Sequence, residues 1–157
     1  MSLDSPSLEG INGHGIRVAI AAARFNQSLV DSLLSRAVKT LEDSGAESPV
    51  VERVPGSAEL PYAVSVLAES GKFDVVIAIG VVIAGDTNHH NLIGDSTADA
   101  LQNIAIREKV PAINGILIVE NIQQAEARTG DAINRGREFA LAAIEMAQFQ
   151  KKWTKMK

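Results

Sequence analysis

The stretch Phe73-Asp74-Val75-Val76-Ile77-Ala78-Ile79 carries the strongest strand signal in the chain. It is short, largely apolar and rich in β-branched residues, which is typical of a strand that is covered on both faces. Three further runs have a strand-like character, and they span residues 16–22, 49–54 and 112–119. We therefore expect four strands, distributed along the whole chain.

Segments with helical spacing of apolar side chains lie between these strands and after the last one. The first begins near Asn26 or Ser28, either of which can cap a helix, and stops at Gly45. Helices are predicted near residues 29–41, 59–70, 92–108, 122–128 and 135–150. This alternation implies right-handed crossovers and an α/β fold, in which a parallel sheet has helices on both faces.

Parallel sheets of this kind bind ligands beyond the carboxyl ends of their strands. The segments expected there are residues 24–27, 55–59, 80–91 and 113–115. The expected α/β domain covers residues 16–150. Residues 1–15 are interpreted as a polar, glycine-rich N-terminal arm, and residues 151–157 as a basic C-terminal tail.

The composition of the 157 residues indicates an ordinary globular domain, with 46% hydrophobic and 22% charged residues. The chain has no cysteine, which excludes disulfides, thiolate zinc sites and cysteine nucleophiles. Its net charge of −4 and its aromatic content of 4% argue against a nucleic-acid interface. The longest apolar run, residues 75–84, is far shorter than the ~20 residues that span a membrane. No secretory signal is visible, so a soluble cytoplasmic protein is expected.

Histidine is scarce, and His14, His89 and His90 are the whole supply. His14 is interpreted as a solvated residue of the arm. His89 and His90 follow the third predicted strand, where a side chain that titrates near neutral pH suits proton transfer. A metal site with Asp86 or Asp95 is an alternative, but the spacing lacks the pattern of a convincing zinc site, and no metal is predicted.

Two segments could bind an anion. Gly85-Asp86-Thr87 precedes a helix, so its backbone N–H groups and hydroxyl could hold a phosphate, or the segment could be a plain turn. Arg128 ends a helix and could bind phosphate or carboxylate with its planar fork, or interact with the helix dipole. Arg135 and Glu138 are three residues apart on the last helix and could form a simple surface pair.

Taken together, these segments resemble the lumazine synthase family (6,7-dimethyl-8-ribityllumazine synthases), in the right order from about residue 17 to residue 148. No single motif is decisive, but several in order are hard to obtain by chance. The motifs that carry the resemblance are Ala23-Arg24-Phe25-Asn26, Val54-Pro55-Gly56-Ser57-Ala58-Glu59-Leu60-Pro61, Gly80-Val81-Val82-Ile83-Ala84-Gly85-Asp86-Thr87-Asn88-His89, Val110-Pro111, Arg128-Thr129-Gly130 and Asn134-Arg135-Gly136.

The resemblance implies a fold and a reaction. The fold is a flavodoxin-like, three-layer α/β/α domain with a four-stranded parallel sheet in the order 2-1-3-4. The reaction joins 5-amino-6-(D-ribitylamino)uracil to 3,4-dihydroxy-2-butanone 4-phosphate and releases phosphate and water. Enzymes of the family need no cofactor and form homopentamers, or multiples of them, with each active site between neighbouring subunits.

The resemblance also implies a role for each site residue. Phe25 packs on the pyrimidine ring, and His89 matches the proton-transfer histidine. The remaining pyrimidine- and ribityl-binding positions are Ser57, Ala58, Glu59, Val81, Val82, Ile83 and Asn114. Phosphate is bound by Asp86, Thr87 and Arg128, with Arg135 and Glu138 in support. One subunit provides Phe25, Ser57, Ile83 and His89, whereas the next provides Asn114 and Arg128.

Several residues depart from the family's pattern. Ala58, His90 and Asn114 each stand where an aromatic side chain is usual, and Arg135 stands where lysine is usual. An aromatic contact contributes about 0.5–1.5 kcal/mol beyond its buried area, so these changes bear on affinity. The alternative function is a non-catalytic or slow, shell-forming homologue that binds flavin or lumazine. A flavodoxin-like flavin carrier is disfavoured, because no Ser/Thr-rich loop follows the first strand.

Overall fold

The computed structural model describes residue 7 and residues 10–154 of the chain, and its centre is a four-stranded sheet. All its strand pairs are parallel, and the strand order is β2-β1-β3-β4. Both features confirm the predicted topology. The strands are β1 (Val18–Ala23), β2 (Val50–Val54), β3 (Val75–Ile83) and β4 (Ala112–Val119).

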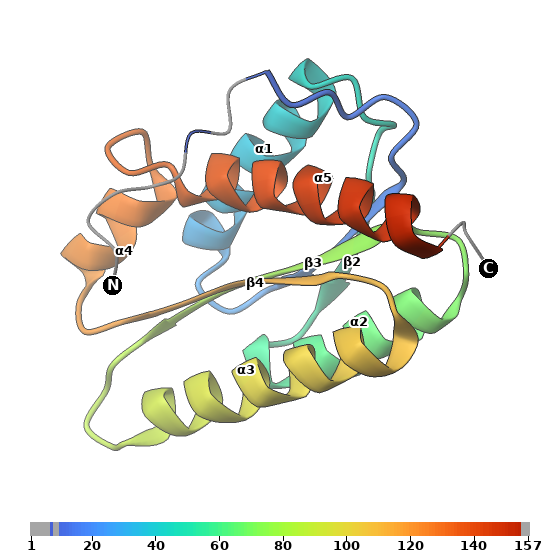
Figure 1. Cartoon of the computed structure of the whole chain (residues 1–157). Coiled ribbons are helices and arrows are strands. Elements are labelled where there is room, and N and C mark those ends of the chain that lie inside the picture. The colour runs from blue at the N-terminus through green and yellow to red at the C-terminus, as the bar shows by residue number, and fades with distance from the viewer. Residues whose placement is uncertain (1–6, 8–9, 155–157) are drawn as a thin grey trace.

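Helices cover both faces of the sheet and make a three-layer α/β/α fold, as expected (Figure 1). One face carries α1, α4 and α5, and the other carries α2 and α3. The helices are α1 (Gln27–Asp43), α2 (Leu60–Glu69), α3 (His89–Glu108), α4 (Ile122–Thr129) and α5 (Arg135–Thr154), and a 3₁₀ turn, η1 (Ser57–Glu59), precedes α2. No helix among the described residues is long and apolar enough to cross a membrane.

The core divides into two parts because successive side chains of a strand point to opposite faces. In β1, Ile20 packs on the side of α1 and α5, whereas Ala19 and Ala21 pack on the side of α2 and α3. All six residues of β1 are buried, as a strand with neighbours on both edges and helices on both faces must be.

The two long helices α1 and α5 approach closely at Gly136. A Cβ atom placed on Gly136 would lie 2.5 Å from the carbonyl oxygen of Leu33 and 2.9 Å from the Cβ of Arg36. Real Cβ atoms do not approach other atoms so closely, so only glycine allows this separation of the helices.

Some element boundaries differ from the prediction. Helix α3 begins at His89 rather than near residue 92, and β3 continues through Gly80 to Ile83 rather than ending at residue 79. The strand continues through Gly80 because this position leaves no room for a larger residue: a Cβ there would collide with the side chain of Ser57. Helix α5 continues to Thr154, so residues 151–154 of the predicted tail are helical.

Part of the predicted arm is attached to the domain. The backbone N–H of Gly13 donates to the carbonyl of Ser44 at 2.7 Å, and the side chain of Gln148 donates to the carbonyl of Asn12 at 2.6 Å. Residues 1–6 and 8–9 of the arm, like residues 155–157 of the tail, lie outside the described residues.

A buried carboxylate lies just before β3, at the edge of the sheet opposite to the strands' carboxyl ends. Asp74 has only 7% of its side chain exposed, and it accepts hydrogen bonds from Arg17 and pairs with Lys151 at 3.3 Å. Burial by itself would raise the pKa of Asp74, but the hydrogen bonds from the Arg17 side chain and backbone and from Lys151 hold it below its ordinary value overall.

Candidate active site

The loops after β1 and β2 meet at the carboxyl edge of the sheet. The backbone N–H groups of Arg24 and Phe25 both lie 3.2 Å from the carbonyl oxygen of Pro55. A Cβ on Gly56 would lie 3.0 Å from the ring of Phe25, so this glycine lets the ring pass over the second loop. The Phe25 side chain is nevertheless 72% exposed. It therefore offers an aromatic surface to a ligand at this edge.

Asn26 joins the first loop to the end of β3. Its backbone has φ = 54°, in the left-handed region, and its Nδ2 donates to the carbonyl oxygen of Val81 at 2.8 Å. Of the two predicted candidates, Asn26 and Ser28, it is Asn26 that occupies the N-cap position of α1, but its side chain makes no capping hydrogen bond with the described residues of that helix. Sequence reasoning therefore missed its positioning role, although Asn26 stood in a motif that carried the resemblance.

The turn after β2 presents a buried hydroxyl and a fixed carboxylate. Ser57 is buried against Gly80 of β3, and Glu59 Oε2 accepts a hydrogen bond from the backbone N–H of Gly56 at 2.8 Å. Ala58, between them, is exposed. Strand β3 contacts this turn, with Gly80 against Ser57, so the residues predicted to hold the pyrimidine and the ribityl chain come from adjacent segments.

The loop after β3 leads directly into α3. His89 is the first residue of this helix and is exposed, and its backbone N–H lies 3.4 Å from Thr87 Oγ1. Asp86 and Thr87 are also exposed. Because the first backbone N–H groups of a helix have no partner within it, this position suits an anionic group.

His90, unlike His89, has a largely buried side chain. Its side chain is 11% exposed, and Nε2 lies 3.8 Å from Oε1 of Glu120, at the end of β4. Its Nδ1 is buried and has no hydrogen-bond partner among the described residues. Nor do any three His, Asp or Glu side chains within the described part of the chain gather closely enough to hold a metal ion.

Three predicted site residues lie apart from the loops described so far and form a second group beside β4. Asn114, Arg128 and Arg135 line a hollow of about 250 Å³, together with Phe139 and residues 116–119 of β4. The expectation that residues 113–115 follow the fourth strand is wrong. Asn114 lies inside β4, opposite Ala78 of β3, as the separate prediction of a strand over residues 112–119 requires.

Both arginines of this hollow also make local contacts. Arg128 Nη1 donates to the carbonyl of Gln124 one turn earlier in α4, at 3.1 Å. Arg135 Nη1 pairs with Glu138 Oε2 at 2.6 Å, and both side chains are about one third exposed. The contacts fix the directions of the two guanidinium groups, each of which retains further N–H donors.

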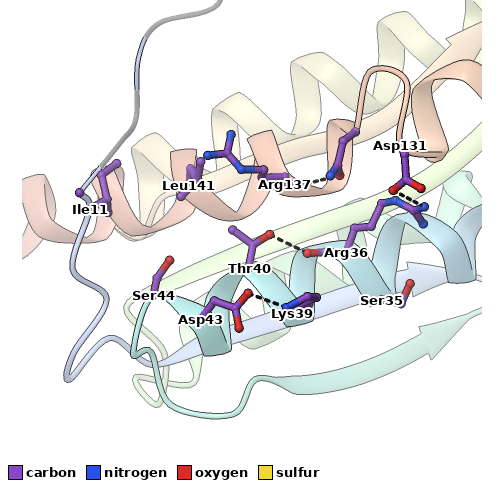
Figure 2. A pocket seen from close by; sticks show the side chains of 12 residues that line it. Ile11, Ser35, Arg36, Lys39, Thr40, Asp43, Ser44, Asp131, Arg137 and Leu141 are labelled. Atoms are coloured by element: carbon purple, nitrogen blue, oxygen red, sulfur yellow. Dashed lines mark hydrogen bonds and ion pairs between the residues drawn. The ribbon is translucent and has the colours of Figure 1, made fainter.

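A larger groove of about 800 Å³ lies between α1 and α5 (Figure 2). None of the predicted site residues, all of which are among the described residues, lines it. Its Arg36 pairs with Asp131 at 2.9 Å, and its Lys39 pairs with Asp43 at 2.7 Å. As Figure 2 shows, these pairs point to different ends of the groove, so its cations do not converge on one point.

Comparison with known proteins identifies relatives over almost the whole domain. The family described as 6,7-dimethyl-8-ribityllumazine synthase matches residues 15–151. A protein of that name from Thermococcus onnurineus is 42% identical over 140 residues, which cover 89% of this chain and 92% of the relative. A protein of the same name from Thermococcus kodakarensis is 40% identical, over 92% of this chain and 94% of the relative. Another from Xylella fastidiosa is 38% identical, over 88% of this chain and 92% of the relative.

Proposed function

Because the chain belongs to the 6,7-dimethyl-8-ribityllumazine synthase family, we propose that it makes the compound for which the family is named. The protein condenses 5-amino-6-(D-ribitylamino)uracil with 3,4-dihydroxy-2-butanone 4-phosphate, as a step of riboflavin biosynthesis. The bonds change in four steps, which are imine formation, phosphate elimination, ring closure and dehydration. Each step moves protons, so positioning combined with acid–base help is the natural strategy.

The carboxyl edge of the sheet is the half of the site that holds the pyrimidine. Phe25 offers its exposed ring to the flat base, and the strand end Val81–Ile83 offers backbone groups beside it. Ser57, Ala58 and Glu59 line the ribityl chain. The Glu59 carboxylate, held by the Gly56 N–H, accepts hydrogen bonds from ribityl hydroxyls.

His89 is the group that moves protons. Its exposed imidazole at the start of α3 lies at the open edge, beside Asp86 and Thr87. An imidazole exchanges protons near neutral pH, as imine formation and dehydration require. The loop of Asp86 and Thr87 takes the phosphate, with the N-terminal backbone N–H groups of α3 as donors.

The hollow beside β4 is the other half of the site, provided by a neighbouring subunit. Arg128 binds the phosphate with its guanidinium fork, and Asn114 binds the pyrimidine edge. Arg135, held by Glu138, supports this end of the site. Phe25, Glu59 and His89 are absent from the lining of this hollow, which supports the division, because the hollow offers arginines for the phosphate but no acid–base histidine.

We propose a pentameric ring, in which each contact brings the carboxyl edge of one subunit to the β4 side of the next. Large apolar side chains that are exposed in the single chain support an interface. Tyr62 and Val66 of α2 are 77% and 49% exposed, and Leu92 and Ile106 of α3 are 64% and 66% exposed. Such a head-to-tail contact uses two different patches and closes into a ring. Because the phosphorylated substrate is charged, we also expect the reaction to run in the cytoplasm.

The observation that carries the proposal is that this member of the family places Phe25, Glu59 and His89 at one edge of its sheet. The test is to mix both substrates with the purified protein and to record the lumazine chromophore together with released phosphate. Equal amounts of both products, formed faster than without protein, are expected. A protein that binds the lumazine but does not accelerate its formation would overturn the catalytic function.

A further inference from the structure

Phe139 is an aromatic residue of the second hollow that the sequence did not single out as a site residue. It lies on α5 one turn after Arg135, and both side chains line the hollow with Asn114 and Arg128. Residues four apart on a helix share one face, so α5 directs a guanidinium group and a phenyl ring to the same place. Phe139 is only partly buried, although it packs on the edge of the main core.

A glycine on β4 fixes the position of this ring. A Cβ on Gly115 would lie 3.0 Å and 3.2 Å from Cδ2 and Cε2 of Phe139, and 2.6 Å from the carbonyl oxygen of Ala78. The ring therefore rests on the bare backbone of β4, on the face of the strand opposite to the Asn114 side chain. Any side chain at position 115 would displace the ring or the strand.

Asn114 presents one kind of group to the same hollow. Its Oδ1 accepts a hydrogen bond from the backbone N–H of Ile116 at 3.0 Å, which leaves the two N–H donors of Nδ2 for a ligand. The hollow thus combines an aromatic surface, amide donors and two guanidinium groups. This combination fits a flat heterocycle with carbonyl oxygens and a nearby anionic group better than it fits an aliphatic ligand.

We propose that Phe139 supplies the aromatic contact of this half of the site and packs against the pyrimidine substrate. It does so in place of the aromatic side chain that the resemblance leads one to expect at position 114. The proposal rests on the proposed function and adds a binding residue to it. The ring lies on the α5 face of the edge strand β4 and the Asn114 side chain on the opposite face, so a base that contacts both lies across the free edge of this strand.

The test replaces the ring with an aliphatic side chain. Phe139→Leu keeps an apolar side chain on the core but removes the flat surface, and Phe149→Leu, on an exposed part of the same helix, is the matched control. We expect Phe139→Leu to raise the KM for the pyrimidine about 2- to 10-fold, as the loss of one aromatic contact predicts. The KM for the phosphorylated ketone should stay within about twofold of the wild-type value, as for any residue that does not touch this substrate.

A second measurement does not depend on turnover. Titration of each variant with 6,7-dimethyl-8-ribityllumazine, followed by its fluorescence, gives a dissociation constant that should weaken by a similar factor. Phe139→Tyr keeps a flat ring and should retain most of the affinity that Phe139→Leu loses. A merely structural role of Phe139 predicts that both dissociation constants stay at the wild-type value while the melting temperature falls.

The outcomes separate the two proposals. If the wild-type protein forms no lumazine, the proposed function fails. If the wild-type protein is active but Phe139→Leu matches Phe149→Leu in pyrimidine KM and in lumazine affinity, the role of Phe139 is overturned and the function stands. Equal increases in both KM values, or a Phe139→Tyr variant that loses as much affinity as Phe139→Leu, would also overturn the role of Phe139.

Discussion

The side-chain amide of Asn26 donates a hydrogen bond to the backbone carbonyl of Val81, with 2.8 Å between Nδ2 and O. The pairing of β1 with β3 ends at Ala22 and Ile79, so this carbonyl lies beyond the last backbone pair. A side chain thus continues the attachment of the first loop to β3 after the strand β1 has ended. Phe25, the neighbour of Asn26, is held over the carboxyl edge as a result.

Replacing Asn26 separates its hydrogen bond from its backbone conformation. Asn26→Gly keeps the left-handed φ but loses the hydrogen bond, and should lower the free energy of unfolding by about 1 kcal/mol. Asn26→Ala also places an ordinary side chain in the left-handed region, which costs about 1–2 kcal/mol more. Urea unfolding measures both values. Equal stabilities of the two variants would contradict the conformational part of this prediction.

The proposed proton-transfer residue can be compared with its neighbour. His89→Ala should slow turnover by about 10²- to 10⁴-fold at most, the usual range for one acid–base group, and by less if positioning of the substrates dominates. His90→Ala should slow it less, because only 11% of the His90 side chain is exposed, whereas His89 is an exposed residue. Single-turnover rates at saturating substrate measure both. If His90→Ala were slower than His89→Ala, the proton-transfer role would belong to His90 instead of His89.

Arg128→Ala should raise the KM for the phosphorylated ketone far more than the KM for the pyrimidine. The reason is that a guanidinium fork matches phosphate oxygens, and Arg128→Lys should restore binding only in part because an ammonium group lacks the fork. Steady-state kinetics with each substrate varied in turn measures the two constants. Equal effects on both would indicate instead that Arg128 only completes the end of α4, through its contact with Gln124.

Two inactive variants should complement each other if the halves of the site come from different subunits. His89→Ala and Arg128→Ala, unfolded and reassembled together in equal amounts, join two intact halves at about one quarter of the interfaces. Activity should approach that fraction of the wild-type value after the residual rates are subtracted. Native mass spectrometry verifies the mixing. Mixed rings without recovered activity would place both residues in the site of one subunit.

The depressed pKa of Asp74 predicts how stability depends on pH. A carboxylate whose folded-state pKa is lowered stabilises the fold above its unfolded pKa of about 3.9, and this contribution is lost as the pH falls through the folded value. Asp74→Asn should therefore lower the free energy of unfolding by about 2–3 kcal/mol at pH 7. The difference from the wild-type protein should shrink below about pH 4. Urea unfolding at several pH values measures it.

The same variant is a control for the site. Asp74 lies at the edge of the sheet opposite to the carboxyl ends, so Asp74→Asn should leave both KM values unchanged at temperatures where the protein is folded. A stability difference that stayed constant down to pH 2 would mean that Asp74 has an ordinary pKa in the folded protein.

Local pattern in the sequence was enough to predict the strands and the layers. Burial on both faces makes a strand such as β3 continuously apolar, and this signal survives without any knowledge of tertiary contacts. The order of the strands came from the resemblance, since apolar runs do not reveal which strand lies beside which. The end of β3 was missed because Gly80 normally interrupts a strand, whereas here it admits the side chain of Ser57.

The sequence indicated which residues belong to the candidate site better than it indicated how they are arranged. Asn114 was expected after a strand, although the strand predicted over residues 112–119 already contained it, and the structure places it within β4. Its pairing with Ala78 of β3 could not be predicted, because local pattern does not give the register of two strands. Phe139 had only the signature of a core residue on a helix. The Phe139 ring of α5 lies against Gly115 of β4, and the sequence carries no signal for a contact between residues of two separate elements.

The close approach of α1 and α5 at Gly136 has a consequence for the proposed ring. Helix α1 starts beside Phe25, and α5 starts at Arg135, so the glycine sets the distance between helices that begin at the two different half-sites of one subunit. A bulkier residue there would push α5 outward and move Arg135 and Phe139 with it. In the proposed ring those residues complete the site of the adjoining subunit, so a substitution in one chain would impair the reaction at the site of its neighbour.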